Sequence, residues 1–146
     1  MNIGLLNGPN LNLLGTREPA IYGHTTLAQV EDHLRTVAAE LSVTLTCAQH
    51  NGEGQLIDQL HNWRGKIDGV VVNAGAYTHT SLALRDAFAA VAIPFVEIHI
   101  SNIHAREPER RHSVLAVAAR GFVCGLGVNG YEYALRGLVS SLRAAG

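Results

Sequence analysis

The feature that most constrains this chain is its alternation of short apolar runs with longer segments of helical period. Continuous apolar or β-branched runs occur at 2–7, 43–49, 68–77, 94–100 and 121–127. Apolar residues recur every three or four positions in the segments 25–41, 53–63, 81–91 and 131–145. Apolar strands that alternate with helices are typical of a parallel sheet with helices on both faces. We therefore predict an α/β fold: a flavodoxin-like, doubly wound, five-stranded parallel sheet with strand order 2-1-3-4-5.

Local signals support these boundaries. Thr26, with Gln29 three positions later, fits a capping box at the start of the first long helix. A short helix is expected at about 113–119, before the fifth strand. No internal repeat or linker is present, so we predict a single domain spanning residues 1–146.

Composition narrows the class of protein. The net charge is −1, only 16% of the residues are charged, and no long basic run occurs, so nucleic acid is not an expected partner. No apolar stretch is long enough to cross a membrane, and the N-terminus does not read as a signal peptide. Cys47 and Cys124 are expected to be buried small hydrophobes in a reducing compartment. We predict a cytoplasmic protein.

Polar residues gather where ligands bind in this architecture, beyond the carboxyl ends of the strands. The stretch LNGPNLNLLGTREPAIYG, residues 6–23, is unusually long for a connection without structure of its own. Arg17 lies close enough to Tyr22 in this loop to favour the phenolate, whose usual pKa is ~10. Glu97 and His99 share one face of the fourth strand, so Glu97 can orient His99 as a general acid. Alternatively, His99 is only part of the network that satisfies a buried Glu97.

Other groups near these strand ends suit substrate binding. Asn10 and Asn73 can hold a water or an enolate oxygen, although Asn73 alone also fits ordinary turn chemistry. His79, Ser101 and Arg110 can bind a carboxylate and hydroxyls, although an arginine cluster is most often a solvated surface. Together the groups suit proton abstraction next to a carbonyl with loss of water.

Three absences limit the chemistry. Lys66 is the only lysine and precedes the third strand, at the opposite end of the sheet from the polar loops, which argues against a Schiff base. No dinucleotide or P-loop motif occurs. His99 and His104 lack zinc-site spacing, so metal catalysis ranks well below acid–base chemistry. We expect neither a cofactor nor a metal.

Several motifs, in order and spanning nearly the whole chain, closely resemble type II 3-dehydroquinate dehydratase. They are LNGPNLNLLGTREPAIYGHTTL, NGEGQLIDQLH, VVNAGAYTHTSLALRDA, PFVEIHISNIHARE with RRHS, and GLGVNGYEYAL. The resemblance implies a catalytic domain that converts 3-dehydroquinate to 3-dehydroshikimate and water through an enolate, without cofactor or Schiff base. That reaction serves the shikimate route to chorismate and aromatic amino acids, or the quinate pathway, and the sequence leaves the two open.

The resemblance also implies roles for individual residues. Tyr22 is the base that takes the proton from C2, and Arg17 lowers its pKa. His99 protonates the departing C1 hydroxyl, Glu97 orients His99, and Asn10 holds a water near the enolate oxygen. The implied substrate contacts are Asn73, His79, Asp86, Ile100 through its backbone, Ser101 and Arg110.

The family assembly is a homo-oligomer, a dodecamer built as a tetramer of trimers, in which Asp86 reaches a neighbouring subunit's site. Its loop carrying Arg17 and Tyr22 acts as a lid. This chain departs from the family pattern at His50 and at Glu109, and we expect Glu109 to point to solvent. Two rivals stay open: a binding module without turnover, and another hydro-lyase or isomerase acting on a different cyclic polyol acid.

Overall fold

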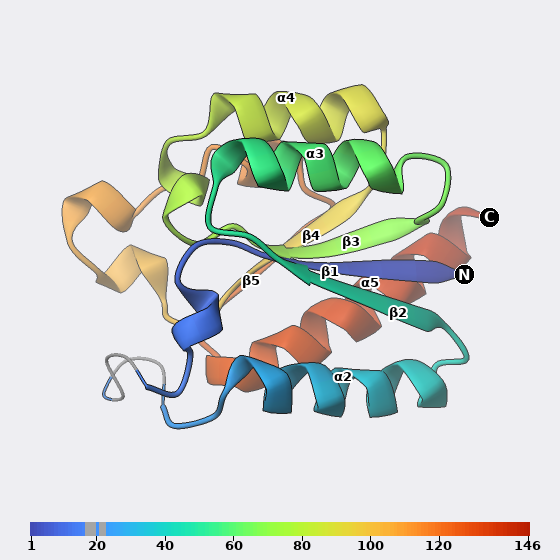
Figure 1. Ribbon diagram of the computed structural model, residues 1–146, viewed down its shortest axis with the longest axis horizontal. Helices are drawn as coiled ribbons and strands as arrows, with labels where there is room; N and C mark the ends of the chain where they lie inside the picture. The colour runs from blue at the N-terminus through green and yellow to red at the C-terminus, as the bar shows by residue number, and fades with distance from the viewer. Residues whose placement is uncertain (17–19, 21–22) are drawn as a thin grey trace.

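The computed structural model of this chain describes residues 1–16, 20 and 23–146. Five parallel strands form one sheet in the order β2-β1-β3-β4-β5. The strands are β1 (Asn2–Asn7), β2 (Thr44–Gln49), β3 (Gly69–Asn73), β4 (Phe95–His99) and β5 (Gly121–Cys124). The helices that flank the sheet are α2 (Leu27–Glu40), α3 (Glu53–Trp63), α4 (Leu82–Val91) and α5 (Gly130–Ala145). This is the predicted doubly wound α/β fold, which is therefore confirmed (Figure 1).

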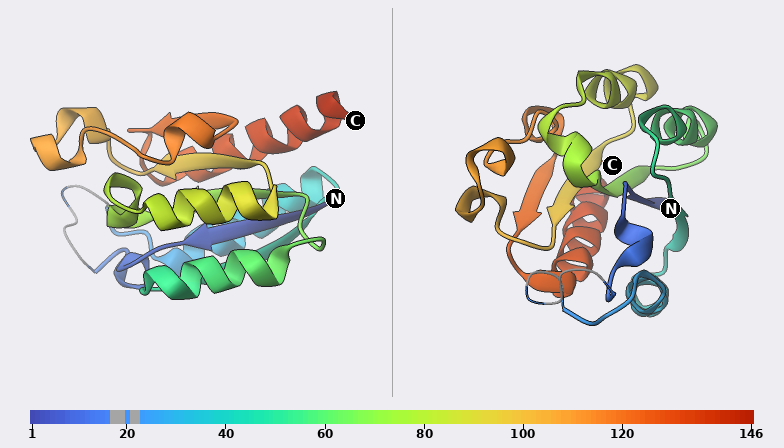
Figure 2. Two further views of the ribbon diagram at one scale, coloured as in Figure 1. Left: turned by 90° about the horizontal axis from the view of Figure 1, so that it is seen from above. Right: turned by 60° about the vertical axis from the view of Figure 1, so that its left-hand side comes forward.

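The sheet lies between two helical layers, with α3 and α4 on one face and α2 and α5 on the other (Figures 1 and 2). Successive side chains of β1 point to opposite faces. Ile3 and Leu5 pack in the core beside α2 and α5, and Leu6 packs beside α3 and α4. Burial on both faces explains why the strands are apolar at consecutive positions.

Helix α2 begins as the sequence predicted. Thr26 Oγ1 accepts a hydrogen bond from the Gln29 backbone N–H at 3.2 Å, and Gln29 Oε1 accepts one from the Thr26 N–H at 2.9 Å. The predicted capping box is therefore confirmed. The helix then buries an apolar stripe against the sheet: Val30, Leu34, Val37 and Ala38.

Two predicted elements differ from the structure. The prediction of a helix at 113–119 is wrong, because only a 3₁₀ turn at Ala116–Ala118 forms there. The Val114 N–H donates instead to the Thr78 carbonyl at 2.8 Å, so tertiary contacts take the backbone groups that a helix would use. The fifth strand, expected to reach residue 127, ends at Cys124 because Gly125 turns the backbone at φ 82°.

Close approach of two loops shapes the carboxyl edge of the sheet. The Gly8 N–H donates to the Asn73 carbonyl at 2.7 Å, which ties the loop after β1 to the end of β3. A Cβ at position 8 would lie 2.5 Å from the Ala74 carbonyl oxygen, so only glycine fits there. At the opposite edge, the Lys66 carbonyl accepts from Asn2 Nδ2 at 3.2 Å, which confirms the predicted place of the only lysine.

Both cysteines are free and half-buried, so the expectation that they are buried hydrophobes holds only in part. Cys47 packs against the core beside α2, whereas Cys124 ends the edge strand β5. Within the residues that the structure describes, no helix is long and apolar enough to cross a membrane.

Candidate active site

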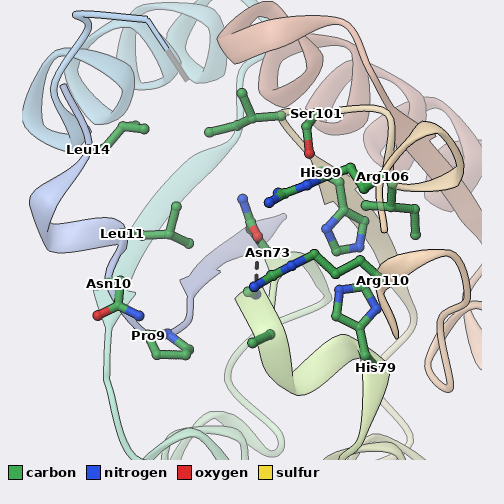
Figure 3. A pocket seen from close by; sticks show the side chains of 14 residues that line it. Pro9, Asn10, Leu11, Leu14, Asn73, His79, His99, Ser101, Arg106 and Arg110 are labelled. Carbon is green, nitrogen blue, oxygen red and sulfur yellow. Dashed lines mark hydrogen bonds between the residues drawn. The ribbon is translucent and has the colours of Figure 1, made fainter. Parts of the chain in front are cut away.

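A pocket opens at the carboxyl edge of the sheet, where the segments after β1, β3 and β4 meet (Figure 3). The space between these segments is about 690 Å³ when the open solvent at the mouth is counted. The lining residues are Pro9, Asn10, Leu11, Leu14, Asn73, Gly75, Ala76, His79, His99, Ile100, Ser101, Ile103, Arg106 and Arg110. Half of these residues are polar or charged, and such a convergence of polar groups in one concave site is typical of a site that binds a polar small molecule.

A buried carboxylate and a histidine form the chemical centre of this pocket. His99 Nε2 lies 2.6 Å from Glu97 Oε1, and the Glu97 side chain is 0% exposed. A carboxylate only accepts hydrogen bonds, so the contact assigns the Nε2 proton to His99 and leaves Nδ1 as the other functional nitrogen. None of the described residues hydrogen-bonds His99 Nδ1, and the ring lines the pocket. The predicted pairing of Glu97 with His99 is thus present.

Two hydroxyls that the sequence analysis did not single out hold Glu97 in place. Ser113 Oγ lies 2.8 Å from each Glu97 carboxylate oxygen, and Thr78 Oγ1 donates to Oε1. Ser113 Oγ also accepts the backbone N–H groups of Leu115 and Ala116, both at 3.0 Å, so its single proton is committed to Glu97. The carboxylate therefore keeps one orientation even before a ligand binds.

His79 stands beside His99 with its ring nearly parallel, the two centroids being 6.4 Å apart (Figure 3). Its Nδ1 lies 2.7 Å from the His112 carbonyl oxygen, which assigns the proton to Nδ1 and leaves Nε2 as an acceptor. Burial lowers the pKa of His79, against the opposing effect of that hydrogen bond, and the nearby His99 and Arg110 lower it further. His79 is thus held neutral and suits a hydroxyl of a ligand.

Arg110 reaches the pocket from the segment after β4. Its Nε donates to Glu107 Oε1 at 2.6 Å, a pair on the 3₁₀ turn that spaces the two residues by three positions. Glu109 is exposed, as predicted, and the acidic partner is Glu107, which the sequence analysis missed. Glu107 fixes one edge of the guanidinium, which leaves the terminal nitrogens as donors to oxygen atoms of a ligand.

Asn10 enters the pocket from the loop after β1 and Asn73 from the end of β3, the two segments that the Gly8–Asn73 hydrogen bond joins. Asn10 has a left-handed backbone, φ 68°, a conformation that asparagine tolerates better than most residues. Asn73 is 4% exposed, and its Oδ1 accepts the Gly75 N–H at 3.2 Å, drawn as the dashed line in Figure 3. Both amides thus lie where sequence reasoning expected neutral hydrogen-bonding groups.

The remaining expected residues divide into three groups. Ile100 and Ser101 line the pocket directly after β4. Asp86 lies on the exposed side of α4 and does not line this pocket. Arg17 and Tyr22 fall outside the described residues.

His50, one of the two residues at which this chain departs from the family pattern, lies outside the pocket. Its Nε2 is 3.0 Å from Gln59 Oε1. Among the residues described, no group of three or more His, Cys, Asp or Glu side chains is arranged to hold a metal ion. The structure defines a doubly wound α/β protein with an oriented histidine in a small-molecule pocket at the switch point of its sheet.

Comparison with known proteins identifies the family. The sequence matches the dehydroquinase class II family over residues 1–139. A 3-dehydroquinate dehydratase from Gemmatimonas aurantiaca is 71% identical over 142 residues, which cover 97% of this chain and 93% of the relative. The crystal structure of type II dehydroquinase from Propionibacterium acnes has a TM-score of 0.90 at 40% identity, covering 95% of this chain and 96% of that one.

A second crystal structure, type II dehydroquinase from Butyrivibrio crossotus, has a TM-score of 0.91 at 39% identity and covers 98% of this chain and 97% of that one. The chain therefore belongs to the class II dehydroquinase family. The family and enzyme class that the motifs predicted are confirmed.

Proposed function

We propose that this chain dehydrates 3-dehydroquinate to 3-dehydroshikimate by acid–base catalysis through an enolate. The observation that carries the proposal is the Glu97–His99 pair, buried behind the pocket and held by Thr78 and Ser113. A binding module has no need of a histidine whose tautomer is fixed by an otherwise costly buried carboxylate. An acid that protonates a leaving group needs that arrangement.

In the proposed reaction, a base removes a proton from C2 and the electron pair forms an enolate with the C3 carbonyl. The enolate then collapses, the C1–oxygen bond breaks, and the departing hydroxyl takes a proton from His99 to leave as water. Glu97 stabilises the protonated imidazole, because its carboxylate accepts a hydrogen bond from the Nε2–H group, with Nε2 and Oε1 2.6 Å apart. Tyr22 is the proposed base and Arg17 the residue that lowers its pKa. Both assignments rest on the family motif.

The other pocket residues hold the substrate in this proposal. Asn10 holds a water near the enolate oxygen, and the neutral His79 and the Asn73 amide meet oxygens of the substrate. Ser101 and the Ile100 backbone bind the carboxylate end. Arg110 reaches hydroxyls. Each of these six residues lines the pocket.

The reaction proceeds without an imine in our proposal. A Schiff base needs an amine, and Lys66, the only lysine, lies at the amino edge of the sheet, opposite the pocket. General acid–base groups supply the chemistry instead. No resident metal or cofactor is part of the proposal.

The cellular setting is proposed from the family. Residues 1–146 form a single catalytic domain of a cytoplasmic enzyme, which serves the shikimate or the quinate pathway. The enzyme assembles as a dodecamer, a tetramer of trimers, in which Asp86 contacts the neighbouring subunit's site. Asp86 lies on the exposed side of α4, where it is available for such a contact.

The test compares the purified wild-type protein with the variant Tyr22→Phe. We expect wild-type turnover of 3-dehydroquinate, and we expect the variant to lose turnover while binding 3-dehydroshikimate within a few fold of wild type. Loss of turnover with retained binding identifies a chemical role. A variant with the full rate would refute the base assignment, and a folded wild-type protein that only binds would support the binding-module alternative.

A further inference from the structure

A buried chain of hydrogen bonds leads away from the pocket through a residue that the mechanism does not use. Asn73 Nδ2 lies 2.8 Å from the hydroxyl of Tyr131, and that hydroxyl lies 2.7 Å from Asn7 Oδ1. Tyr131 and Asn7 are both 0% exposed. Tyr131 belongs to α5 and Asn7 ends β1, so the chain joins three elements behind one pocket residue.

The direction of every hydrogen bond in this chain follows from one backbone group. The Gly75 N–H donates to Asn73 Oδ1 at 3.2 Å, which places the Asn73 oxygen on that side and its nitrogen towards Tyr131. The Tyr131 oxygen therefore accepts from Asn73, and its own proton has Asn7 Oδ1 as its acceptor. Burial raises the pKa of Tyr131, so the phenol stays protonated and remains a donor.

Asn7, at the far end of this series of hydrogen bonds, carries an energetic cost that also indicates a role in orienting Tyr131. With its oxygen turned to Tyr131, Asn7 has a fully buried Nδ2 that no described residue accepts from. An unsatisfied buried donor is unfavourable, and such a group calls for an explanation. An apolar side chain at this strand end would carry no such unsatisfied donor. The fixed orientation of Tyr131 accounts for the asparagine.

We propose that Tyr131, backed by Asn7, is a positioning residue that fixes the Asn73 amide so that its second N–H faces the substrate. The Asn73 amide carries two N–H groups, one taken by Tyr131, and the side chain lines the pocket. A correctly aimed N–H suits a hydroxyl or carbonyl oxygen of a cyclic polyhydroxy keto acid. The inference rests on the proposed function for its substrate, and it adds a residue that does not line the pocket.

The experiment measures kcat and KM for 3-dehydroquinate and the inhibition constant of 3-dehydroshikimate in Tyr131→Phe. Loss of one neutral hydrogen bond leads us to expect both KM and the inhibition constant to rise about fivefold. We expect kcat to stay within about twofold, because a contact kept from ground state to transition state changes KM alone. The matched control is Tyr133→Phe, which removes the same hydroxyl from an exposed residue of α5 and should change nothing.

A double-mutant cycle separates positioning from general loss of structure. In an Asn73→Ala background, Tyr131→Phe should leave KM unchanged, because the amide that it positions is gone. An unchanged KM in the Tyr131→Phe single variant with a lowered kcat, or an equal rise of KM in both backgrounds, would overturn the proposal. The first result would mean that Tyr131 acts only in the transition state and does not position a substrate-binding amide, and the second would mean that it does not act through Asn73.

Two further measurements keep the test decisive. If Tyr131→Phe does not fold, Asn7→Ala removes the acceptor that directs the Tyr131 proton. It should raise KM in the wild-type background and leave it unchanged beside Asn73→Ala, and an unchanged KM in the wild-type background would overturn the proposal. A folded wild-type protein without turnover would refute the proposed function instead, and calorimetric binding of 3-dehydroshikimate to the same variants would then test Tyr131 separately.

Discussion

Replacing Glu97 by glutamine perturbs the centre of the site with almost no change in volume. The wild-type carboxylate accepts from His99 Nε2 at 2.6 Å, from Ser113 at 2.8 Å and from Thr78. A glutamine offers one accepting oxygen and brings two donors of its own. At least one hydroxyl or the imidazole N–H must then face an N–H group inside a fully buried site.

The magnitude follows from the hydrogen bond that the reaction needs. A hydrogen bond to a charged group contributes about 1.5 to 3 kcal/mol. If that contribution stabilises the protonated His99, Glu97→Gln should lower kcat by about 10- to 100-fold, since each 1.36 kcal/mol changes a rate about tenfold. The unsatisfied donor should also cost about 1 to 3 kcal/mol of folding stability, and Tm should fall by roughly 3 to 10 °C.

The assay is steady-state turnover of 3-dehydroquinate, with Tm measured on the same samples at one protein concentration. Glu40→Gln is the matched control, because it removes the same charge from an exposed glutamate paired with Arg136 far along α2. Retention of kcat within twofold of wild type in a folded Glu97→Gln sample would refute the role that we give to the Glu97–His99 pair.

Two further predictions concern titratable groups outside the Glu97–His99 pair. Burial is the main cause that lowers the pKa of His79 in the folded protein. As the pH falls below the ordinary histidine pKa of 6.5, the unfolded chain therefore binds a proton at His79 that the folded chain does not. The stability that the folded protein has above pH 6.5 is lost progressively below it. The pH dependence of Tm between pH 7 and 5 should therefore flatten in His79→Gln; identical slopes would contradict the assignment. Burial, with the charge of Glu31 as a smaller cause, raises the pKa of the Cys47 thiol to about 11. In Cys124→Ser, where Cys47 is the sole thiol, labelling at neutral pH should run more than about a hundredfold slower in folded than in urea-unfolded protein, and comparable rates would refute the burial argument.

The fold was predictable because its signals are local. The central strands β1, β3 and β4 are buried and largely apolar on both faces, the capping box of Thr26 and Gln29 marks a helix start, and the βα alternation is typical of a doubly wound sheet. The prediction of a helix at 113–119 was wrong because Ser113 hydrogen-bonds to Glu97 and Val114 to Thr78. Such contacts leave no periodic trace in the sequence.

The contacts of the candidate site were predictable only where the two residues are close in the sequence. Glu97 and His99 are two residues apart on one strand, so their contact follows from strand geometry alone. Tyr131 and Asn7 are 124 positions apart, and nothing near either residue marks their meeting. Acidic partners were equally hard to assign: Arg110 pairs with Glu107, three positions away on a turn, whereas its neighbour Glu109 is exposed.

The central claim is that this chain dehydrates 3-dehydroquinate with its own acid and base groups and without an imine. The most direct measurement treats purified protein with 3-dehydroquinate and borohydride, removes both reagents, and then follows the conjugated enone of the product in the ultraviolet after fresh 3-dehydroquinate and a chelator are added. We predict the same rate as for untreated protein assayed without chelator. Loss of activity on borohydride treatment in the presence of substrate would show that an imine forms, and would contradict the mechanism.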